Sequence, residues 1–350
     1  MINNKIGIFS VGTGGHVLPG SRVLDELDNC GFDLNNVVIV TGKRNEKRFY
    51  KKHKIEILEL DLVRTKLNVY HYFRKIFSIF RSLFELKRII NDKKISIIFA
   101  TGSYISPLVA LLGFRYKIPT FLQEQNIYAG LGNYIGSYFA KKVFTSFPDT
   151  KNLLKKKIDY VGPVLSKSIE EKNNNSDQHF TIGVQGGSQG SEQINKLIYD
   201  SFNDWNGAKI KLVHISGKLN VKPINNENVL YSQYEFIDNI SDYYDGLDIQ
   251  ITRGGGGLLE GASLGIMQLI LPYTYGTTSS HQNKNAMYLV QNKAGILIND
   301  DSDNLISIIR KFILDSRELN LYKKNSVSSV KLGARECITR ELINEYKKNI

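Results

Sequence analysis

Cysteine is scarce in this sequence, and no apolar run is long. Two of the 350 residues are cysteine, Cys30 and Cys337, and their separation matches neither a metal-binding nor a redox motif. We therefore expect reduced thiols, as in a cytosolic protein. The longest apolar run, residues 105–114, is about half as long as a membrane-spanning helix requires, so no such helix is expected. Lys5 is followed at once by a strand-like run and a glycine loop, a start that does not resemble a secretion signal.

Acidic residues are too few to balance the basic ones. The chain has 46 Lys and Arg against 34 Asp and Glu, which gives a formal net charge of +12 and a pI of about 9.4. This excess favours anionic partners such as nucleotide diphosphates, acidic lipid headgroups or nucleic acid. Because the sequence has no nucleic-acid-binding motif and no repeat, we do not expect nucleic acid as a partner. An AT-rich genome, which raises the lysine and asparagine content, is a simpler explanation of the same charge.

Short β-branched runs alternate with longer amphipathic stretches, as in parallel βαβ units. The alternation stops in a polar segment, residues 165–178, and then restarts. We expect this linker to join two α/β domains, residues 1–164 and 179–335. A C-terminal helix over residues 336–350 is expected to pack back on the first domain. The expected strands are residues 6–11, 37–40, 55–60, 95–100, 120–123, 142–145, 180–185, 210–215, 249–252, 268–271 and 295–298.

Two glycine-rich loops stand where a strand is expected to lead into a helix. The first is residues 12–16, Gly-Thr-Gly-Gly-His, and the second is residues 186–190, Gly-Gly-Ser-Gln-Gly. Bare backbone amides followed by a helix N-terminus form an anion site, so each unit suits a diphosphate group. The doubling predicts twin nucleotide-binding domains that face one cleft.

The first loop lacks the features of a dehydrogenase. The third glycine of the G-x-G-x-x-G fingerprint is missing, and the second strand ends at Thr41-Gly42 without the acidic residue that would hold a ribose. His16 instead follows the glycines at the expected start of a helix. A histidine at this point is suited to act as a general base. A polar or helix-capping histidine in a loop is the structural alternative.

In the second domain, a run of glycines at residues 254–257 precedes another expected helix. Arg253 is followed by four glycines, which allow a ligand to lie against the main chain. Glu260, early in that helix, could accept both hydroxyls of a ribose or could only compensate the charge of the helix N-terminus. The polar residues 281–286 could face the same cleft. An Asp-Ser-Asp sequence at residues 301–303 is more typical of a turn and helix cap than of a metal site.

Several motifs occur in a fixed order along nearly the whole chain. They are GTGGHVLPG from Gly12, GSY-x-S-P from Gly102, EQN-x-x-AGL from Glu124, VGPV from Val161, GGSQG from Gly186, EFID from Glu235 and HQNKNA from His281. In combination they resemble the MurG family, the GlcNAc transferases that complete the lipid-linked peptidoglycan precursor. The resemblance implies a two-domain GT-B fold and an inverting transfer from UDP-GlcNAc to an undecaprenyl-linked acceptor, with no metal and no other cofactor.

The same resemblance implies roles for individual residues. His16 is the first candidate for the catalytic base, and Glu124 is the second. The implied UDP-GlcNAc-binding positions are Thr13, Gly14 and Gly15 beside the pyrophosphates, Asn126 at the GlcNAc moiety, Ser188 at the donor diphosphate, the backbone of Ile237 at the uracil, Glu260 at the ribose and Gln282 at the nucleotide-sugar.

Some positions depart from the family pattern. Ser166 stands where the family usually has a nucleotide-binding arginine, and the neighbouring Lys167 lacks the forked geometry of a guanidinium. Gln123 stands in place of a histidine, and Val11 in place of a glycine. These departures leave open a related GT-B transferase with another lipid or glycan acceptor. A UDP-GlcNAc epimerase and a non-catalytic nucleotide-sugar-binding module are further alternatives, although motifs in both halves disfavour the binding module.

A basic, aromatic stretch over residues 72–90 has apolar side chains at helical spacing with arginines and lysines between them. Part of this stripe is expected to cover the sheet, as a βαβ helix must. The wide apolar arc beside basic residues also suits partial insertion into an anionic membrane surface. With Phe114 and Arg115 extending the patch, we expect a peripheral protein on the cytoplasmic face of the plasma (inner) membrane.

Overall fold

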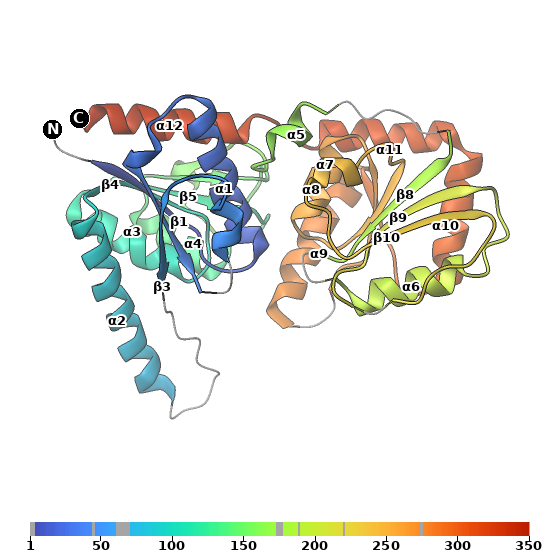
Figure 1. Cartoon of the computed structure of the whole chain (residues 1–350), viewed down its shortest axis with the longest axis horizontal. Helices are drawn as coiled ribbons and strands as arrows, with labels where there is room; N and C mark the ends of the chain where they lie inside the picture. Colours follow the sequence, from blue (N-terminus) through green and yellow to red (C-terminus); the bar gives the residue numbers. More distant parts are fainter. Residues whose placement is uncertain are drawn as a thin grey trace. The chain divides into compact units, whose positions relative to one another are not determined.

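The chain divides into two compact units, each with its own sheet (Figure 1). One unit is Met1–Leu165 together with Gly333–Ile350, and the other is Ser166–Leu332. The computed structural model describes residues 4–43, 46–60, 71–172, 178–187, 190–219, 221–273 and 276–349, with the backbone alone for residues 71–78 and 276–280.

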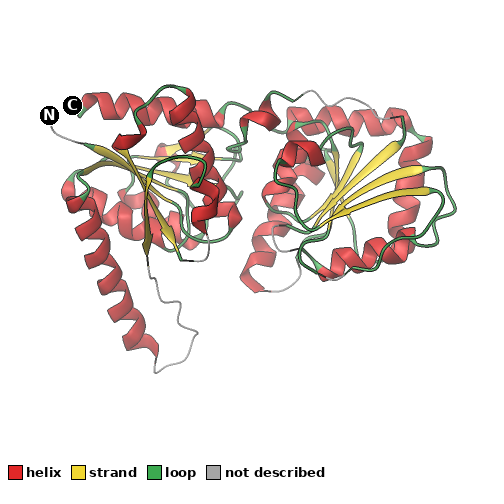
Figure 2. Ribbon diagram, viewed as in Figure 1, coloured by secondary structure: helices red, strands yellow, loops and turns green. Residues whose placement is uncertain are grey.

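The first unit is built on a seven-stranded parallel sheet with the order β3-β2-β1-β4-β5-β6-β7. Helices cover both faces of this sheet (Figure 2), so its central strands are largely apolar. The strands are β1 (Lys5–Phe9), β2 (Val37–Gly42), β3 (Glu56–Leu60), β4 (Ile95–Ala100), β5 (Thr120–Glu124), β6 (Lys142–Thr145) and β7 (Ile158–Tyr160). The helices are α1 (Gly14–Asn29), α2 (His71–Asp92), α3 (Ile105–Tyr116), α4 (Leu131–Phe139) and α12 (Ala334–Lys348), with short 3-10 turns η1 (Leu34–Asn36), η2 (Glu46–Tyr50) and η3 (Lys155–Lys157).

Two apolar layers hold this sheet between its helices. On one face, Ile8 packs in a buried cluster with Leu24 of α1 and Ile338 of α12. On the other face, Ile98 packs in a second cluster that includes Val109 of α3 and buried residues of α2. Alternate residues of a strand point to opposite faces, so a single buried strand supplies both layers.

Helix α12 is held to the first unit by charge as well as by apolar packing. The Arg335 Nε lies 3.0 Å from the Glu26 Oε2, and both side chains are largely buried. The side-chain amide of Asn4 donates to the Asn349 carbonyl at 2.6 Å, so the two ends of the described chain lie side by side (Figure 1). The chain therefore begins and ends in the same unit.

The second unit has a six-stranded parallel sheet with the order β10-β9-β8-β11-β12-β13. One face is closed by a buried cluster to which α6 and α10 contribute, for example through Ile198 and Ile309. The strands are β8 (Phe180–Gln185), β9 (Ile210–Ile215), β10 (Val229–Tyr234), β11 (Ile249–Thr252), β12 (Met267–Ile270) and β13 (Gly295–Leu297). The helices are α5 (Lys167–Glu170), α6 (Glu192–Phe202), α7 (Ile240–Tyr243), α8 (Gly256–Ser263), α9 (Gly276–Gln291), α10 (Ser302–Leu314) and α11 (Ser316–Ser328).

The α/β class with two parallel sheets is confirmed, and the structure adds detail that the sequence pattern did not give. The strands β7 and β10 were not predicted, and both are edge strands. The second unit begins at Ser166, so the short helix α5 belongs to it although the segment was expected to be a linker, and the first unit resumes at Gly333. Within the described part of the chain, no helix is both long enough and apolar enough to cross a membrane.

Candidate functional site

The first glycine loop joins β1 to α1 and leaves the start of that helix without a side-chain cap. Gly12 has a φ of +134°, a conformation that favours glycine, and its N–H donates to the Glu46 Oε1 at 2.8 Å. Thr13 stands at the N-cap position but its side chain makes no capping hydrogen bond. Gly14 and Gly15 form the first turn. An uncapped first turn with small residues presents its backbone amides to an anion.

His16 is held in one tautomer by a neighbouring loop. Its Nδ1 lies 3.0 Å from the carbonyl oxygen of Thr101, and the Thr101 hydroxyl donates to the His16 carbonyl. A carbonyl oxygen only accepts, so the Nδ1 is the donor in this contact. The Gln125 Nε2 lies 3.3 Å from the same Nδ1. With the Nδ1 engaged in this way, the Nε2 is the ring nitrogen that remains for contact with a ligand.

The Glu124 carboxylate accepts four hydrogen bonds from nearby residues. Its Oε1 accepts from the backbone N–H and the side-chain amide of Asn126, at 2.9 and 3.0 Å. Its Oε2 accepts from the Gly130 N–H at 3.1 Å and from the Asn133 amide at 2.9 Å. Four donors on a buried carboxylate fix the loop after β5 and orient Asn126. Both carboxylate oxygens of Glu124 are thus engaged by donors of the same segment and of α4.

The second glycine loop joins β8 to α6 in the second unit. Gly187 and Gly190 both have positive φ, +91° and +79°. A Cβ on Gly190 would lie 2.2 Å from the Ser216 carbonyl oxygen, so only glycine fits against that strand end. Ser191 caps α6, its Oγ accepting from the Ile194 N–H at 3.3 Å. Ser188, the position expected at the donor diphosphate, lies outside the described residues.

Glu260 lies on α8 and is oriented by a buried tyrosine. The Tyr244 hydroxyl donates to the Glu260 Oε2 at 3.1 Å and accepts from the Gln185 side-chain amide at 2.9 Å. Burial raises the pKa of Tyr244 well above its ordinary value, so the hydroxyl remains a donor. The chain from Gln185 through Tyr244 connects the end of β8 to the expected ribose-binding carboxylate.

Gln282, on α9, supports the glycine run that precedes α8. A Cβ on Gly254 would lie 2.1 Å from the Gln282 carbonyl oxygen, so the two backbones touch only because residue 254 is glycine. The Gln282 Oε1 accepts from the Tyr273 N–H at 3.1 Å. The Asn285 side-chain amide donates to the Gly254 carbonyl at 3.0 Å. Gln282 therefore contacts both the glycine run before α8 and the segment after β12.

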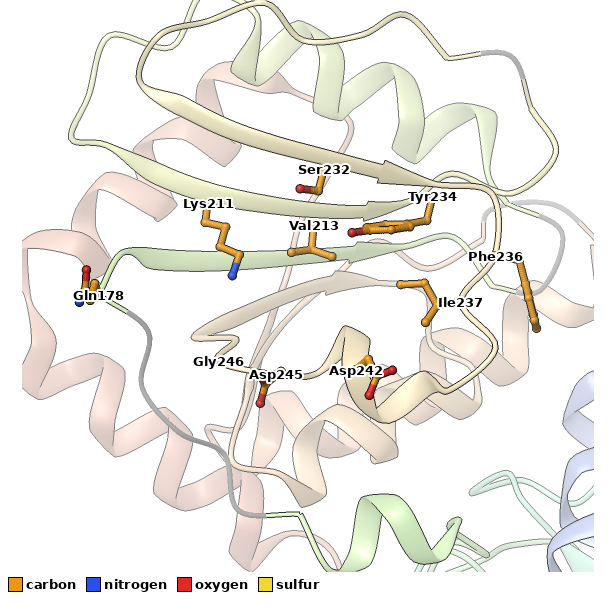
Figure 3. A pocket seen from close by; sticks show the side chains of 10 residues that line it. All are labelled: Gln178, Lys211, Val213, Ser232, Tyr234, Phe236, Ile237, Asp242, Asp245 and Gly246. Atoms are coloured by element: carbon orange, nitrogen blue, oxygen red, sulfur yellow. The ribbon is translucent and has the colours of Figure 1, made fainter.

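Ile237 lies at one end of a hollow of about 720 Å³ on the open face of β9 and β10 (Figure 3). Tyr234 and Phe236, both exposed, line the same end. The far end is lined by polar residues, including Lys211 and Asp245. The loop after β10 thus offers backbone groups and aromatic side chains around Ile237, as a flat base would require.

The acidic residues at positions 301–303 begin a helix. Asp301 caps α10, its Oδ1 accepting from the Asp303 and Asn304 N–H groups at 3.0 and 3.4 Å. The prediction of a helix cap here is confirmed. In the part of the chain that the structure describes, no group of three acidic, histidine or cysteine side chains could hold a metal ion.

Comparison with known proteins gives the family. The N-terminal domain model of glycosyltransferase family 28 matches residues 6–145, and the C-terminal domain model matches residues 181–337. The UDP-N-acetylglucosamine--N-acetylmuramyl-(pentapeptide) pyrophosphoryl-undecaprenol N-acetylglucosamine transferase of Thermosipho africanus is 32% identical, over 98% of this chain and 99% of that protein. The transferase of the same name from Borreliella burgdorferi is 28% identical over 99% of each chain. The chain belongs to the MurG family.

Solved structures agree with this assignment at the level of the fold. The crystal structure of Acinetobacter baumannii MurG matches with a TM-score of 0.77 at 20% identity, covering 97% of this chain and 99% of that one. A UDP-GlcNAc 2-epimerase from Neisseria meningitidis matches with a TM-score of 0.67 at 15% identity, covering 97% and 100%. At such identities the likeness shows the GT-B fold alone. Since full-length sequence similarity is to transferases, MurG membership makes the chain a glycosyltransferase.

Two of the MurG motifs meet in the first unit. A Cβ on Gly15 would lie 3.1 Å from the Gln125 amide, so the first glycine loop touches the segment that follows β5 and carries Asn126. Sequence reasoning missed the groups that fix these residues. Thr101 directly precedes a MurG motif, which is a weak signal, but it acts through its carbonyl. Tyr244 lies in no motif, and nothing in its sequence surroundings indicates its contact with Glu260.

Proposed function

We propose that this protein transfers GlcNAc from UDP-GlcNAc to the lipid-linked MurNAc-(pentapeptide) pyrophosphoryl-undecaprenol, with inversion, to form the completed peptidoglycan precursor lipid II. The observation that carries the proposal is 32% identity over the full length of a transferase named for this reaction. Both glycine loops agree with it, and so do the contacts that orient His16 and Glu260. An acceptor other than the undecaprenyl-linked one is the alternative that the sequence departures leave.

The second unit binds the donor in this proposal. Ser188 and the start of α6 hold the diphosphate, the backbone of Ile237 reads the uracil, Glu260 accepts from the ribose hydroxyls and Gln282 contacts the nucleotide-sugar. As the bond between the anomeric carbon and the diphosphate breaks, negative charge grows on the departing UDP. A helix N-terminus and fixed backbone amides stabilise that charge without a metal ion.

The first unit activates the acceptor. The acceptor hydroxyl forms the new bond to the anomeric carbon and passes its proton to the His16 Nε2, while the Nδ1–H continues to donate to Thr101. Thr13, Gly14 and Gly15 lie beside the pyrophosphates, and Asn126 contacts the GlcNAc moiety. Glu124, held by four donors, positions Asn126 and does not take the proton.

Peripheral contact with an anionic membrane is the remaining part of the proposal. Helix α2 buries Leu86 and Ile90 against the first sheet but leaves Phe80 and Phe84 65% and 72% exposed. Phe114, on the neighbouring helix α3, is 66% exposed. Exposed aromatic side chains on a basic protein suit the interface of anionic lipids, where a polyprenyl-linked acceptor is found. We place this contact at the cytoplasmic face of the plasma membrane.

Acceptor-dependent UDP release tests the assignment of His16. We expect wild type to release UDP with a soluble acceptor analogue in the presence of EDTA, and His16→Ala to lower kcat by about 10²- to 10⁴-fold with unchanged UDP-GlcNAc binding. His179→Ala is the matched control and should retain activity. Equal activity of His16→Ala and wild type would remove His16 from the mechanism.

A further inference from the structure

The short turn η2 packs against β2 and α1 and reaches the first glycine loop with a buried glutamate. Glu46, the first residue of η2, is 3% exposed, and its Oε1 accepts from the Gly12 N–H at 2.8 Å. A Cβ on Gly42 would lie 2.5 Å from the Glu46 Oε2, so the carboxylate fills the space that a side chain at the end of β2 would occupy. The Glu46 carboxylate is therefore packed where β1 becomes the loop.

Tyr50, the last residue of η2, holds both sides of the same loop. Its hydroxyl forms a hydrogen bond with the Ser10 Oγ before the loop and donates to the Val17 carbonyl in α1 at 3.3 Å. Burial raises the pKa of Tyr50 above its ordinary value, so the hydroxyl stays protonated. The Ser21 hydroxyl donates to the Phe49 carbonyl at 2.7 Å, which ties η2 to the next turn of α1. The turn thus fixes the residues that enter and leave the loop.

The charge of Glu46 is unfavourable for an anion at this loop. Glu46 occupies the Gly12 N–H, so the amides left for an anionic ligand are those of residues 13–15. A carboxylate near these amides repels a pyrophosphate, and its charge alone would weaken binding. A favourable contribution has to come through the backbone instead. The hydrogen bond holds Gly12, whose φ of +134° sets the direction in which the following residues continue.

We propose that Glu46 is a positioning residue for the acceptor substrate. It acts through Gly12, holding the loop in the conformation in which the amides of residues 13–15 meet the acceptor pyrophosphate. Its charge also keeps that anion away from the Gly12 end of the loop. Tyr50 supports the same conformation by joining Ser10 to Val17. This inference rests on the proposed function, since it takes the acceptor pyrophosphate to lie beside the first loop.

Steady-state kinetics with a soluble acceptor analogue that retains the pyrophosphate test this role, because charge and positioning predict opposite signs. Removal of a repelling charge would lower the acceptor KM. Positioning predicts that Glu46→Ala raises the acceptor KM about tenfold and leaves KM for UDP-GlcNAc within about twofold. Glu46→Gln keeps an oxygen that can accept from the Gly12 N–H, so its acceptor KM should stay within about threefold of wild type.

The matched control is Glu59→Ala, which removes a carboxylate of the same unit that pairs with Lys47 of η2 at 3.2 Å. It should change neither KM. Tyr50→Phe is a second test without a change of charge, because it removes only the hydroxyl that joins Ser10 to Val17. It should raise the acceptor KM several-fold and leave KM for UDP-GlcNAc within about twofold.

Three results would overturn the role of Glu46 and leave the proposed function standing. They are an unchanged or lower acceptor KM in Glu46→Ala, a Glu46→Gln variant as impaired as Glu46→Ala, and equal rises in KM for donor and acceptor. If wild type binds UDP but does not turn over this acceptor, the proposed function itself fails.

Discussion

Single side chains in this protein are fixed by partners far away in sequence. The ring of His16 is set by the carbonyl of Thr101, and Glu260 is set by Tyr244. The glycine and histidine pattern alone made His16 a candidate, and its role as the base stays a prediction. The orienting partners could not be selected, since a backbone carbonyl and a buried tyrosine leave no distinctive sequence signal.

Tyr244→Phe tests the orientation of Glu260. The change removes the hydroxyl that donates to the carboxylate, and it leaves the Gln185 amide without its acceptor. We expect KM for UDP-GlcNAc to rise about 5- to 30-fold and stability to fall by about 1–3 kcal/mol, measured by steady-state kinetics and urea unfolding. The neighbouring Tyr243 is equally buried and makes no described hydrogen bond to Glu260, so Tyr243→Phe is the matched control and should leave KM for UDP-GlcNAc unchanged.

His214 makes the stability of the second unit sensitive to pH. Burial lowers its pKa to about 4 from 6.5, and its neutral ring bridges the Tyr231 hydroxyl and the Asn195 amide oxygen. Between those two pH values the unfolded chain binds more protons than the folded one, so stability falls as the pH falls through this window. Urea unfolding should give about 2 kcal/mol less stability at pH 5 than at pH 7.5 from this residue.

The matched comparison is His214→Gln, which has no group that titrates in this range. Its unfolding free energy should lack the His214 share of the loss between pH 7.5 and pH 5. If the variant and wild type lose the same amount, then His214 is protonated in the folded protein and its burial does not have the assigned effect.

At the level of elements, the central strands were predictable and the edges were not. The strand β4 was predicted over the same residues that the structure gives, because both of its faces are largely buried and only Ser96 interrupts its apolar residues. The edge strand β10 has partly exposed and polar residues, so it shows neither a continuous run nor a clean alternation. The sequence did not indicate that helix α4 has an exposed apolar surface, where Leu131 is 72% exposed.

The exposed face of α2 carries the prediction of membrane contact. Phe80→Glu together with Phe84→Glu should lower binding to vesicles of anionic phospholipid by at least about tenfold, because two aromatic side chains leave the interface and two negative charges enter it. Activity with a soluble acceptor should be unchanged. Leu314→Glu, at a residue 86% exposed in the second unit, is the matched control. Vesicle binding that the double variant retains would contradict the assignment of this face.

Each of the two units contains a strand, a glycine loop and a helix in the same order, β1 to α1 in the first unit and β8 to α6 in the second. Two glycine loops in one sequence indicated two α/β domains, and their motifs, read together, indicated the family. The pairing of Arg335 with Glu26 could not have been predicted, because its partners come from opposite ends of the chain and an ion pair carries no sequence period. The bulk charge of +12 indicates anionic partners but does not choose among them.

Following the sugar itself is the most direct test of the proposed reaction. Wild-type protein would be incubated with UDP-GlcNAc labelled in the GlcNAc moiety and an undecaprenyl-pyrophosphoryl-MurNAc-pentapeptide, and the products separated into lipid and aqueous fractions. Transfer predicts one labelled GlcNAc in the lipid fraction, in β configuration, for each UDP released. Label recovered as free GlcNAc, or as an epimerised UDP-sugar without lipid product, would contradict it.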